Sequence, residues 1–370
     1  MKTPINQYEP DIREADIKAV NEYLRSGGYI TEFKKTRELE KSISKHCSTI
    51  DSVIFPNGTL SLFAILKSLN IGRGDTVVVP NYTMAATAFA VIETGAEVIF
   101  CDIELPSCYI CFDSFKEVIN QQKKKPKAVM LMNANGRYPS YEINNFLSFC
   151  TKEGIKVIED SAQSLGSYYQ DGRHIGTYGI AGSFSFSMPK IITAGQGGAV
   201  ISNDEVLISR LRSYRDFGRL SGGNDVHKEI GLNLKYTDLQ ATLVLSQLNR
   251  INQLAEIKKR NFKLLFESVK SEHLYINKND LIHTTPWFYE LITPHRESLI
   301  NWLSKYNIKT RKMYPELNRQ RAFTNHPQNA IEFKNSNFIS SNGLWLPSHP
   351  KLEENEINRI IEALNTFRPS

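Results

Sequence analysis

The chain has 370 residues, of which 41% are hydrophobic and 23% are charged, and its formal net charge is +6. This size and composition fit a globular protein with one large domain and a smaller one attached, and no apolar run is long enough to predict a transmembrane helix. Basic residues are not interleaved with aromatic ones on a recognisable module, so we expect no nucleic-acid partner and no membrane partner. The polar N-terminus lacks the apolar core of a signal peptide, which favours a cytoplasmic location.

The first 160 residues alternate between helical and strand-like patterns. Helices are predicted over 11–25, 36–47, 59–69, 85–93, 113–122 and 141–153, and apolar strands over 53–55, 75–80, 97–101, 127–132 and 155–158. Strands with continuous apolar runs are typical of a mostly parallel sheet that helices cover on both faces, so the predicted fold class is α/β. Ligands of such sheets bind at the carboxyl ends of the strands, where Gly58, Met84, Asn135 and Asp160 all fall.

A strand that leads into Gly58-Thr59 at the start of a helix is a candidate anion site. Free backbone N–H groups and the positive end of the helix dipole would face a phosphate there. Simple N-capping by Thr59 is compatible with this role.

The five cysteines are scattered, and Cys108 and Cys111 form an isolated C-x-x-C. A zinc ribbon requires a second such pair, so we expect no metal site. The favoured interpretation is a set of small residues in a reduced protein, with a redox role as the weaker alternative.

The stretch from 155 to 202 concentrates reactive residues. Asp160 ends a strand, and Gln163 follows three residues later. Further along, Ser185 lies five residues before a single lysine, Lys190, and a glycine turn and another apolar run follow the lysine. A lysine among small residues can form an imine with a carbonyl cofactor, an acid can hold a protonated ring nitrogen, and a serine can bind phosphate. Taken alone, a buried strand with a surface acid and a solvated lysine explains the same residues.

The second half of the chain predicts a change of architecture near residue 250. A helix over 204–215 precedes a long polar loop over 216–230, in which Arg219 and His227 are either contacts for an anionic substrate or solvated side chains. One helix is predicted from Asp238 to about 269, followed by a strand at 286–291, helices at 296–306 and 353–366, and a strand at 343–347. We therefore expect a large domain over 1–250 and a small α+β domain over 251–370.

Three short segments carry a resemblance to a known family. They are Glu159-Asp160-Ser161-Ala162-Gln163, Phe184-Ser185-Phe186 with Lys190, and Ala194-Gly195-Gln196-Gly197-Gly198. They resemble the E-D-A-A-Q, F-S-F and T-G-E-G-G segments of the DegT/DnrJ/EryC1/StrS family of sugar aminotransferases, and the likeness extends from about Gly27 to Leu352. The resemblance implies a PLP fold-type I aminotransferase that uses pyridoxal 5′-phosphate (PLP).

The same resemblance implies roles for individual residues. Lys190 would bind the cofactor and move the proton, Asp160 would hold the ring nitrogen, and Gln163 would bond the ring hydroxyl. Met84 stands where relatives commonly have an aromatic residue that stacks on the ring. The implied phosphate contacts are Gly58, Thr59, Ser185 and Asn233. Asn233 would reach the cofactor of the neighbouring subunit, so the resemblance implies a homodimer with shared active sites.

The expected substrates are a keto sugar and an amino donor, glutamate by analogy with the family. The expected substrate contacts are Tyr29, Asn135, Arg219, His227, Lys235, Arg311 and Tyr314. The favoured sugar is a nucleotide-linked 4-keto-6-deoxy sugar for surface-polysaccharide biosynthesis, as in perosamine synthases. Amination of an 8-keto-3-deoxy-octulosonate is an alternative, since Gln196 replaces the usual glutamate. A PLP-dependent sugar dehydratase is disfavoured, because those relatives have a histidine in place of Lys190.

Overall fold

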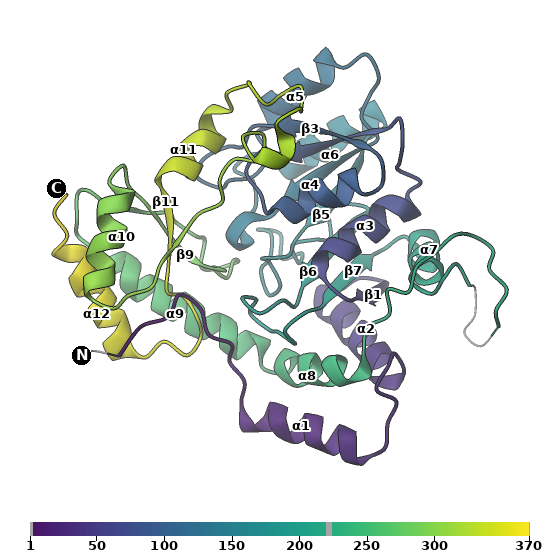
Figure 1. Ribbon diagram of the computed structural model, residues 1–370, viewed down its shortest axis with the longest axis horizontal. Coiled ribbons are helices and arrows are strands. Elements are labelled where there is room, and N and C mark those ends of the chain that lie inside the picture. The colour runs from purple at the N-terminus through teal and green to yellow at the C-terminus, as the bar shows by residue number, and fades with distance from the viewer. Residues whose placement is uncertain (1–2, 220–223, 370) are drawn as a thin grey trace.

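The computed structural model describes residues 3–219 and 224–369. Its larger sheet has seven strands in the order β1-β7-β6-β5-β4-β2-β3. The strands are β1 (Asp51–Phe55), β2 (Thr76–Pro80), β3 (Glu97–Cys101), β4 (Ala128–Met132), β5 (Lys156–Asp160), β6 (Ala181–Ser185) and β7 (Gly198–Ser202). Neighbours from β3 to β6 are parallel, and β7 runs antiparallel to both β6 and β1. The predicted α/β fold with a mostly parallel sheet is confirmed (Figure 1).

Helices cover both faces of this sheet because its strands are apolar on both sides. One face packs against α3 (Gly58–Ser68), α4 (Ala85–Ile92) and α7 (Glu205–Arg215). The other face packs against α2 (Lys34–Cys47), α5 (Phe112–Gln121), α6 (Ile143–Glu153) and α8 (Asp238–Leu248). With every strand buried between helices, polar side chains are left to gather at the strand ends.

A second, smaller sheet follows in the C-terminal third. Its antiparallel strands, in the order β10-β11-β9-β8, are β8 (Tyr275–Ile276), β9 (Tyr289–Ile292), β10 (Arg311–Lys312) and β11 (Gly343–Leu346). A separate apolar core joins it to α9 (Ile251–Ser268), α10 (Arg296–Lys305) and α12 (Glu354–Asn365), while α11 (Lys334–Asn342) precedes β11. The domain boundary at residue 250 stays a prediction.

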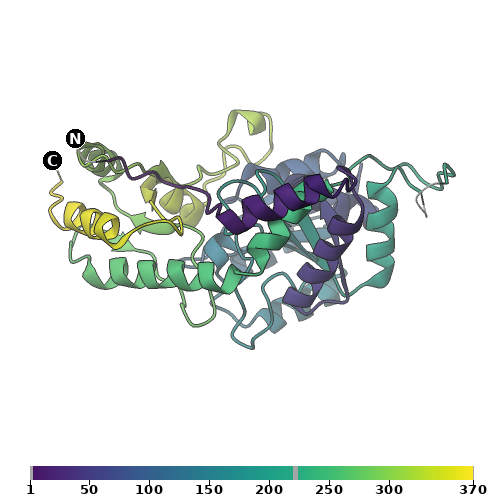
Figure 2. The same cartoon turned by 90° about the horizontal axis from the view of Figure 1, so that it is seen from below.

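The single helix predicted from Asp238 to about 269 is wrong, because α8 ends at Leu248 and α9 begins at Ile251. At the break, Arg250 leaves helical geometry, and its guanidinium bonds Asp16 of α1 (Glu14–Arg25) at 2.6 Å. Figures 1 and 2 show α8 beside the large sheet and α9 reaching the small one. No helix within the described ranges is long and apolar enough to cross a bilayer.

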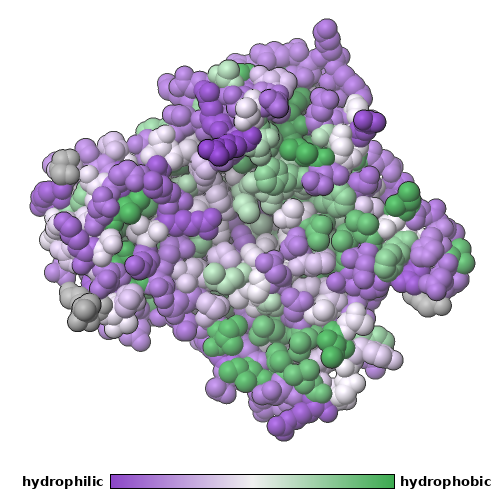
Figure 3. Space-filling view, in the orientation of Figure 1, coloured by the Kyte–Doolittle hydropathy of each residue, from purple (hydrophilic) through white to green (hydrophobic). Residues whose placement is uncertain are grey.

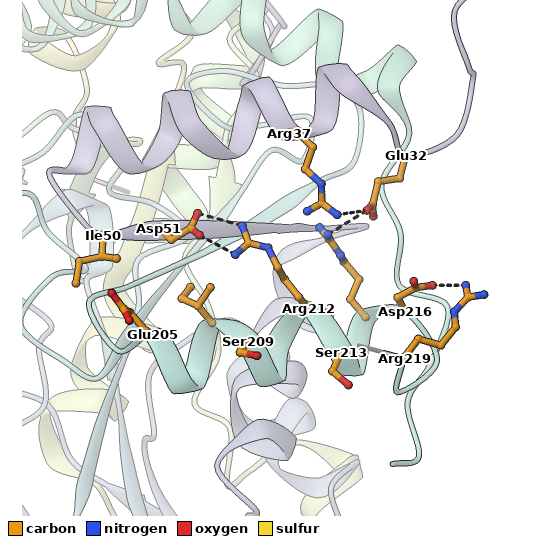
Figure 4. Close-up of a pocket in the computed structure, with 12 residues that line it drawn as sticks. Glu32, Arg37, Ile50, Asp51, Glu205, Ser209, Arg212, Ser213, Asp216 and Arg219 are labelled. Atoms are coloured by element: carbon orange, nitrogen blue, oxygen red, sulfur yellow. Dashed lines mark hydrogen bonds and ion pairs between the residues drawn. The ribbon is translucent and has the colours of Figure 1, made fainter. Parts of the chain in front are cut away.

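A buried arginine of α7, Arg215, bonds Glu40 of α2. Its neighbour Arg212 is joined to Asp51 in Figure 4. Arg215 is 1% exposed, and its guanidinium bonds Glu40 at 2.7 Å, the carbonyl of Ile54 at 2.8 Å and Glu32 at 3.1 Å. Burial opposes ionisation of Glu40, but the surrounding arginines, Arg215 foremost, keep its pKa below the ordinary value. A cavity of about 410 Å³ lies beside this network and is lined by charged side chains of both signs.

Replacing Arg215 by methionine should destabilise the protein by about 3–5 kcal/mol, because Glu40 loses its most buried cationic partner. Urea unfolding monitored by circular dichroism would measure this loss. The matched control is Arg212→Met, since Arg212 is 32% exposed and pairs mainly with Asp51. We expect that control to cost at most about 1 kcal/mol. Equal losses in the two variants would contradict the special importance of the buried pair.

The exposed edge of β3 is covered by a side chain. The amide of Gln328 accepts a hydrogen bond from Phe100 N at 2.7 Å and donates one to Phe100 O at 2.9 Å. The ring of His326 lies 3.0 Å from Val98 O on the same strand. The chain after β10 therefore satisfies backbone groups of the edge strand that no further strand reaches.

Candidate active site

A cavity of about 630 Å³ lies at the carboxyl ends of β4, β5 and β6, where Met132, Asp160 and Ser185 end their strands. The small sheet closes its other side with Trp287, Arg311 and Tyr314. The predicted site residues that line the cavity are Gly58, Thr59, Met84, Asp160, Gln163, Ser185, Lys190, Arg311 and Tyr314. The structure thus brings together residues from both halves of the chain.

Asp160 lies at the cavity floor and is 2% exposed. Its Oδ2 accepts a hydrogen bond from the Thr87 hydroxyl at 2.6 Å, and its Oδ1 accepts one from Ala162 N at 3.2 Å. Burial raises the pKa of Asp160, and these two donors and the charge of Lys190 oppose that rise. A cationic group in the cavity would find an oriented carboxylate at the strand end.

Lys190 lies in the segment between β6 and β7 and is half-buried. Its Nζ is 4.2 Å from the centroid of the Trp287 ring. Burial lowers the pKa of Lys190 to about 8, the Asp160 carboxylate opposes this shift, and Arg311 adds to it. An amine with this pKa is neutral in a substantial fraction of molecules near neutral pH, as a nucleophile or a general base must be.

The reaction of Lys190 with a small aldehyde, trapped by borohydride, should accelerate as pH rises through about 8 and then level off. Below that value the amine is mostly protonated and cannot attack a carbonyl. Mass spectrometry of the peptide that contains Lys190 would give the rate at each pH. Arg311→Gln should raise the midpoint, because it removes a positive charge that disfavours the ammonium form. A midpoint near 10.4, the ordinary value for lysine, would contradict the prediction.

The start of α3 supplies backbone donors to the cavity. The Asn57 side chain, not Thr59, caps this helix by accepting from Leu60 N at 2.9 Å. Gly58 and Thr59 are the first two residues of α3, so the helix contains no carbonyl four residues earlier to accept from their backbone N–H groups. These N–H groups therefore remain available to an anion. A Cβ added to Gly58 would lie 3.1 Å from the Cβ of Ser185, so a side chain there would crowd the serine. Gly58 therefore leaves this wall of the cavity without a side chain.

The Gln163 side chain lines the cavity and contacts two residues, Asn135 and Tyr314. Gln163 Oε1 accepts from Asn135 N at 2.7 Å, and its Nε2 lies 3.5 Å from the Tyr314 hydroxyl. Asn135 is fully buried in a left-handed conformation with φ 56°, and its Oδ1 accepts from Phe288 N at 2.7 Å. The structure thus places Asn135 between the two sheets and outside the cavity lining, and its predicted contact with substrate stays a prediction.

Five other predicted residues do not line this cavity: Tyr29, Arg219, His227, Asn233 and Lys235. Tyr29 is 64% exposed, and Asn233 is also exposed. Arg219 and Lys235 both pair with Asp216, and the His227 ring lies 2.8 Å from Phe217 O. Part of the predicted loop, residues 220–223, lies outside the described residues. A role for these five residues in catalysis stays a prediction.

Sequence reasoning missed three residues that contact the predicted ones. Thr87 bonds Asp160, Trp287 packs against Lys190, and the Tyr8 hydroxyl bonds the carbonyl of Lys190. Thr87 lies one turn into a helix whose start was already a candidate, which was a usable signal. Tyr8 and Trp287 lie about a hundred residues or more from Lys190 in sequence, and no local pattern indicates such contacts. In the parts of the chain that the structure describes, no group of three or more potential ligands could hold a metal ion.

Comparisons with known proteins agree with this geometry. The sequence profile of the DegT/DnrJ/EryC1/StrS aminotransferase family matches residues 10–365. The GDP-perosamine synthase of Escherichia coli O157:H7 is 29% identical over 97% of this chain and 97% of its own length. The dTDP-3-amino-3,6-dideoxy-alpha-D-galactopyranose transaminase of Aneurinibacillus thermoaerophilus is 28% identical over 98% and 96%. A DegT DnrJ EryC1 StrS aminotransferase from Brucella abortus superposes with a TM-score of 0.87 at 27% identity, covering 95% of this chain and 94% of that one.

Proposed function

Because this chain belongs to the DegT/DnrJ/EryC1/StrS aminotransferase family, we propose that it transfers the amino group of glutamate to a nucleotide-linked 4-keto-6-deoxy sugar. The chain is a PLP-dependent sugar aminotransferase, and the proposal concerns which sugar and which donor it uses. One observation supports amino transfer at this site: the amides that begin α3, the Asp160 carboxylate and the Lys190 amine surround a single cavity.

The residues around this cavity fit PLP. Gly58 lies close to Ser185 and has no side chain, which leaves room for a phosphate against the first amides of α3. Asp160 is the buried carboxylate that would face the ring nitrogen, and Gln163 would face the ring hydroxyl. Met84 lines the same cavity and would pack on a ring face. When bound, PLP supplies an aldehyde that reacts with amines and a ring that delocalises the electron pair left by C–H cleavage.

In the proposed mechanism, Lys190 Nζ is the group that moves protons. Its lowered pKa provides the neutral amine that would take a proton from the donor's α-carbon and pass it to the cofactor's aldehyde carbon, and that would move a proton in the reverse direction, to the sugar carbon, in the second half of the reaction. The carboxylate of Asp160 holds a proton at the ring nitrogen, and the Thr87 hydroxyl fixes its orientation. Arg311, at the cavity rim, would bind an anionic part of either substrate.

Nucleotide linkage is supported by the two relatives, whose names state a GDP-linked and a dTDP-linked sugar. The test is a mass-spectrometric screen in which glutamate and a panel of keto sugars are incubated with the purified enzyme. We expect amine formation from a nucleotide-linked 4-keto-6-deoxy sugar. Amination of an 8-keto-3-deoxy-octulosonate instead would overturn the assigned substrate, and release of ammonia without an amino sugar would indicate a dehydratase.

We further propose that the enzyme is a homodimer with shared sites, in which Asn233 binds the cofactor phosphate of the partner. The exposed positions of Asn233 and Tyr29, outside their own cavity, support this proposal. Apolar side chains also gather over α1 in Figure 3, where Ile17 is 46% exposed and Leu24 is 50% exposed. A patch of this kind is typical of an interface. The predicted cytoplasmic location stays a prediction.

Shared sites can be tested by mixing two inactive variants, Lys190→Ala and Asn233→Ala, under conditions that allow subunit exchange. A mixed dimer has one site with both native residues and one with neither. We expect activity to appear on mixing, whereas neither variant alone should be active. If Asn233 served its own chain, each site of the mixed dimer would lack one residue and no activity would appear.

A further inference from the structure

The segment that carries Lys190 is held from outside by two side chains. The Trp287 indole N–H donates to Pro189 O at 2.6 Å, and the Tyr8 hydroxyl donates to Lys190 O at 2.5 Å. Two consecutive carbonyls of one loop are therefore fixed by residues from distant parts of the chain. Within the loop itself, Lys190 N donates to Ser187 O at 3.0 Å, so the local turn is also closed.

Both outside residues belong to the side of the molecule that carries the small sheet. The N-terminal segment with Tyr8 pairs with the chain after α10, since Ile5 N donates to Asn307 O at 2.9 Å and Lys309 N donates to Ile5 O at 2.9 Å. Ile5 is 1% exposed within the core of the small sheet. Trp287 lies just before β9. The position of the lysine, on a loop of the large sheet, thus depends on the small one.

A buried lysine fixes Trp287 in turn. Lys258 of α9 is 1% exposed and donates to the carbonyls of Trp287, at 2.9 Å, and of Ser348. The Trp287 ring stacks on Phe288 with centroids 3.8 Å apart. Its centroid is also 4.2 Å from Lys190 Nζ, so the indole limits the directions in which the amine can point. Backbone and side chain of Lys190 are both restrained.

We propose that Tyr8 and Trp287 are positioning residues that hold Nζ of Lys190 at the reacting carbon during proton transfer. This inference rests on the proposed role of Lys190 as the proton-transfer group. A lysine that must move a proton between two carbons loses rate when its amine samples other orientations, because misplacement by about 1 Å costs up to about 10²-fold. Binding of substrate, by contrast, depends on other walls of the cavity.

Tyr8→Phe tests the proposal, because it removes the hydroxyl and leaves the ring in contact with Phe288, at 6.0 Å between centroids. We expect kcat to fall about tenfold while KM for the keto sugar changes by less than about twofold. The apparent pKa of the visible absorbance of the holoenzyme should also shift, because the amine of Lys190 contributes to that absorbance. Trp287→Phe should shift the same two quantities in the same direction.

Tyr141→Phe is the matched control. Tyr141 is also half-buried, and its hydroxyl donates to Ile110 O at 3.1 Å, outside the active-site cavity. If Tyr8→Phe and Trp287→Phe retain the kcat and the absorbance pKa of Tyr141→Phe, the proposal is overturned, even if their thermal stability falls. If either variant does not fold, the other decides through the same readouts. If the wild-type enzyme itself forms no amine and no visible absorbance, the proposed function fails and not the positioning role.

Discussion

Lys190→Ala should lower the rate of amino transfer by at least about 10⁴-fold and remove the visible absorbance of the holoenzyme. In the proposed mechanism, the substitution deletes the amine that would bind the cofactor and also the group that would move the proton. No other lysine lines the cavity, so nothing in the described residues can substitute for it. Formation of amino sugar from glutamate, followed by mass spectrometry, and an absorbance spectrum of the purified protein would measure both losses.

The loss in Lys190→Ala should be partly reversible. A small primary amine added to the solution should restore some activity, since a free amine can enter the cavity and act as a general base. The matched control, Lys152→Ala at the exposed end of α6, should behave like the unmodified enzyme. A Lys190→Ala variant that retained full activity and absorbance would show that the reactive lysine lies elsewhere.

Asp160→Ala should reduce kcat by about 10³-fold or more, because it removes the buried carboxylate that we propose holds a proton on the ring nitrogen of PLP. In the native protein the Thr87 hydroxyl and Ala162 N–H donate hydrogen bonds to this carboxylate, so in the variant both donors would lose their acceptor. Steady-state kinetics with saturating donor and sugar would measure the loss.

Glu159→Gln supplies the control for Asp160→Ala, one residue earlier on the same strand. Glu159 is also fully buried, but its carboxylate accepts hydrogen bonds from Tyr169 and from the amides of Gly176, Tyr178 and Gly179. Successive side chains of a strand point to opposite faces. We therefore expect Glu159→Gln to lower thermal stability and to leave kcat of the folded enzyme nearly unchanged. If Asp160→Ala matched the unmodified enzyme instead, the strand-end site would be wrong.

The core of the site could be predicted from sequence because its residues lie in short, contiguous patterns. Asp160 ends an apolar strand, Gly58 begins a helix after a strand, and Lys190 precedes a glycine turn. The topology of parallel strands then brings these ends to one edge of the sheet. The fold class could also be predicted from local patterns, because uninterrupted apolar strands alternate with amphipathic helices along the chain.

The parts that could not be predicted depend on contacts between distant segments. The break between α8 and α9 is invisible in the helical pattern, because Arg250 leaves the helix to reach Asp16, more than two hundred residues earlier in the chain. Asn135 sits at a strand end like the other candidates, yet the approach of Phe288 decides that its amide faces the small sheet. Arg219, expected at the substrate, lies outside the cavity lining and pairs with Asp216, a contact that no local pattern indicates.

The glutamine that covers β3 has a consequence outside catalysis. Unpaired strand edges are templates on which other chains add strands, and this is how many folded proteins begin to aggregate. By engaging both backbone groups of Phe100, the Gln328 side chain makes that part of the sheet unavailable to such addition. The segment after β10 thus blocks strand addition at this edge, while its Tyr314 lines the candidate active-site cavity.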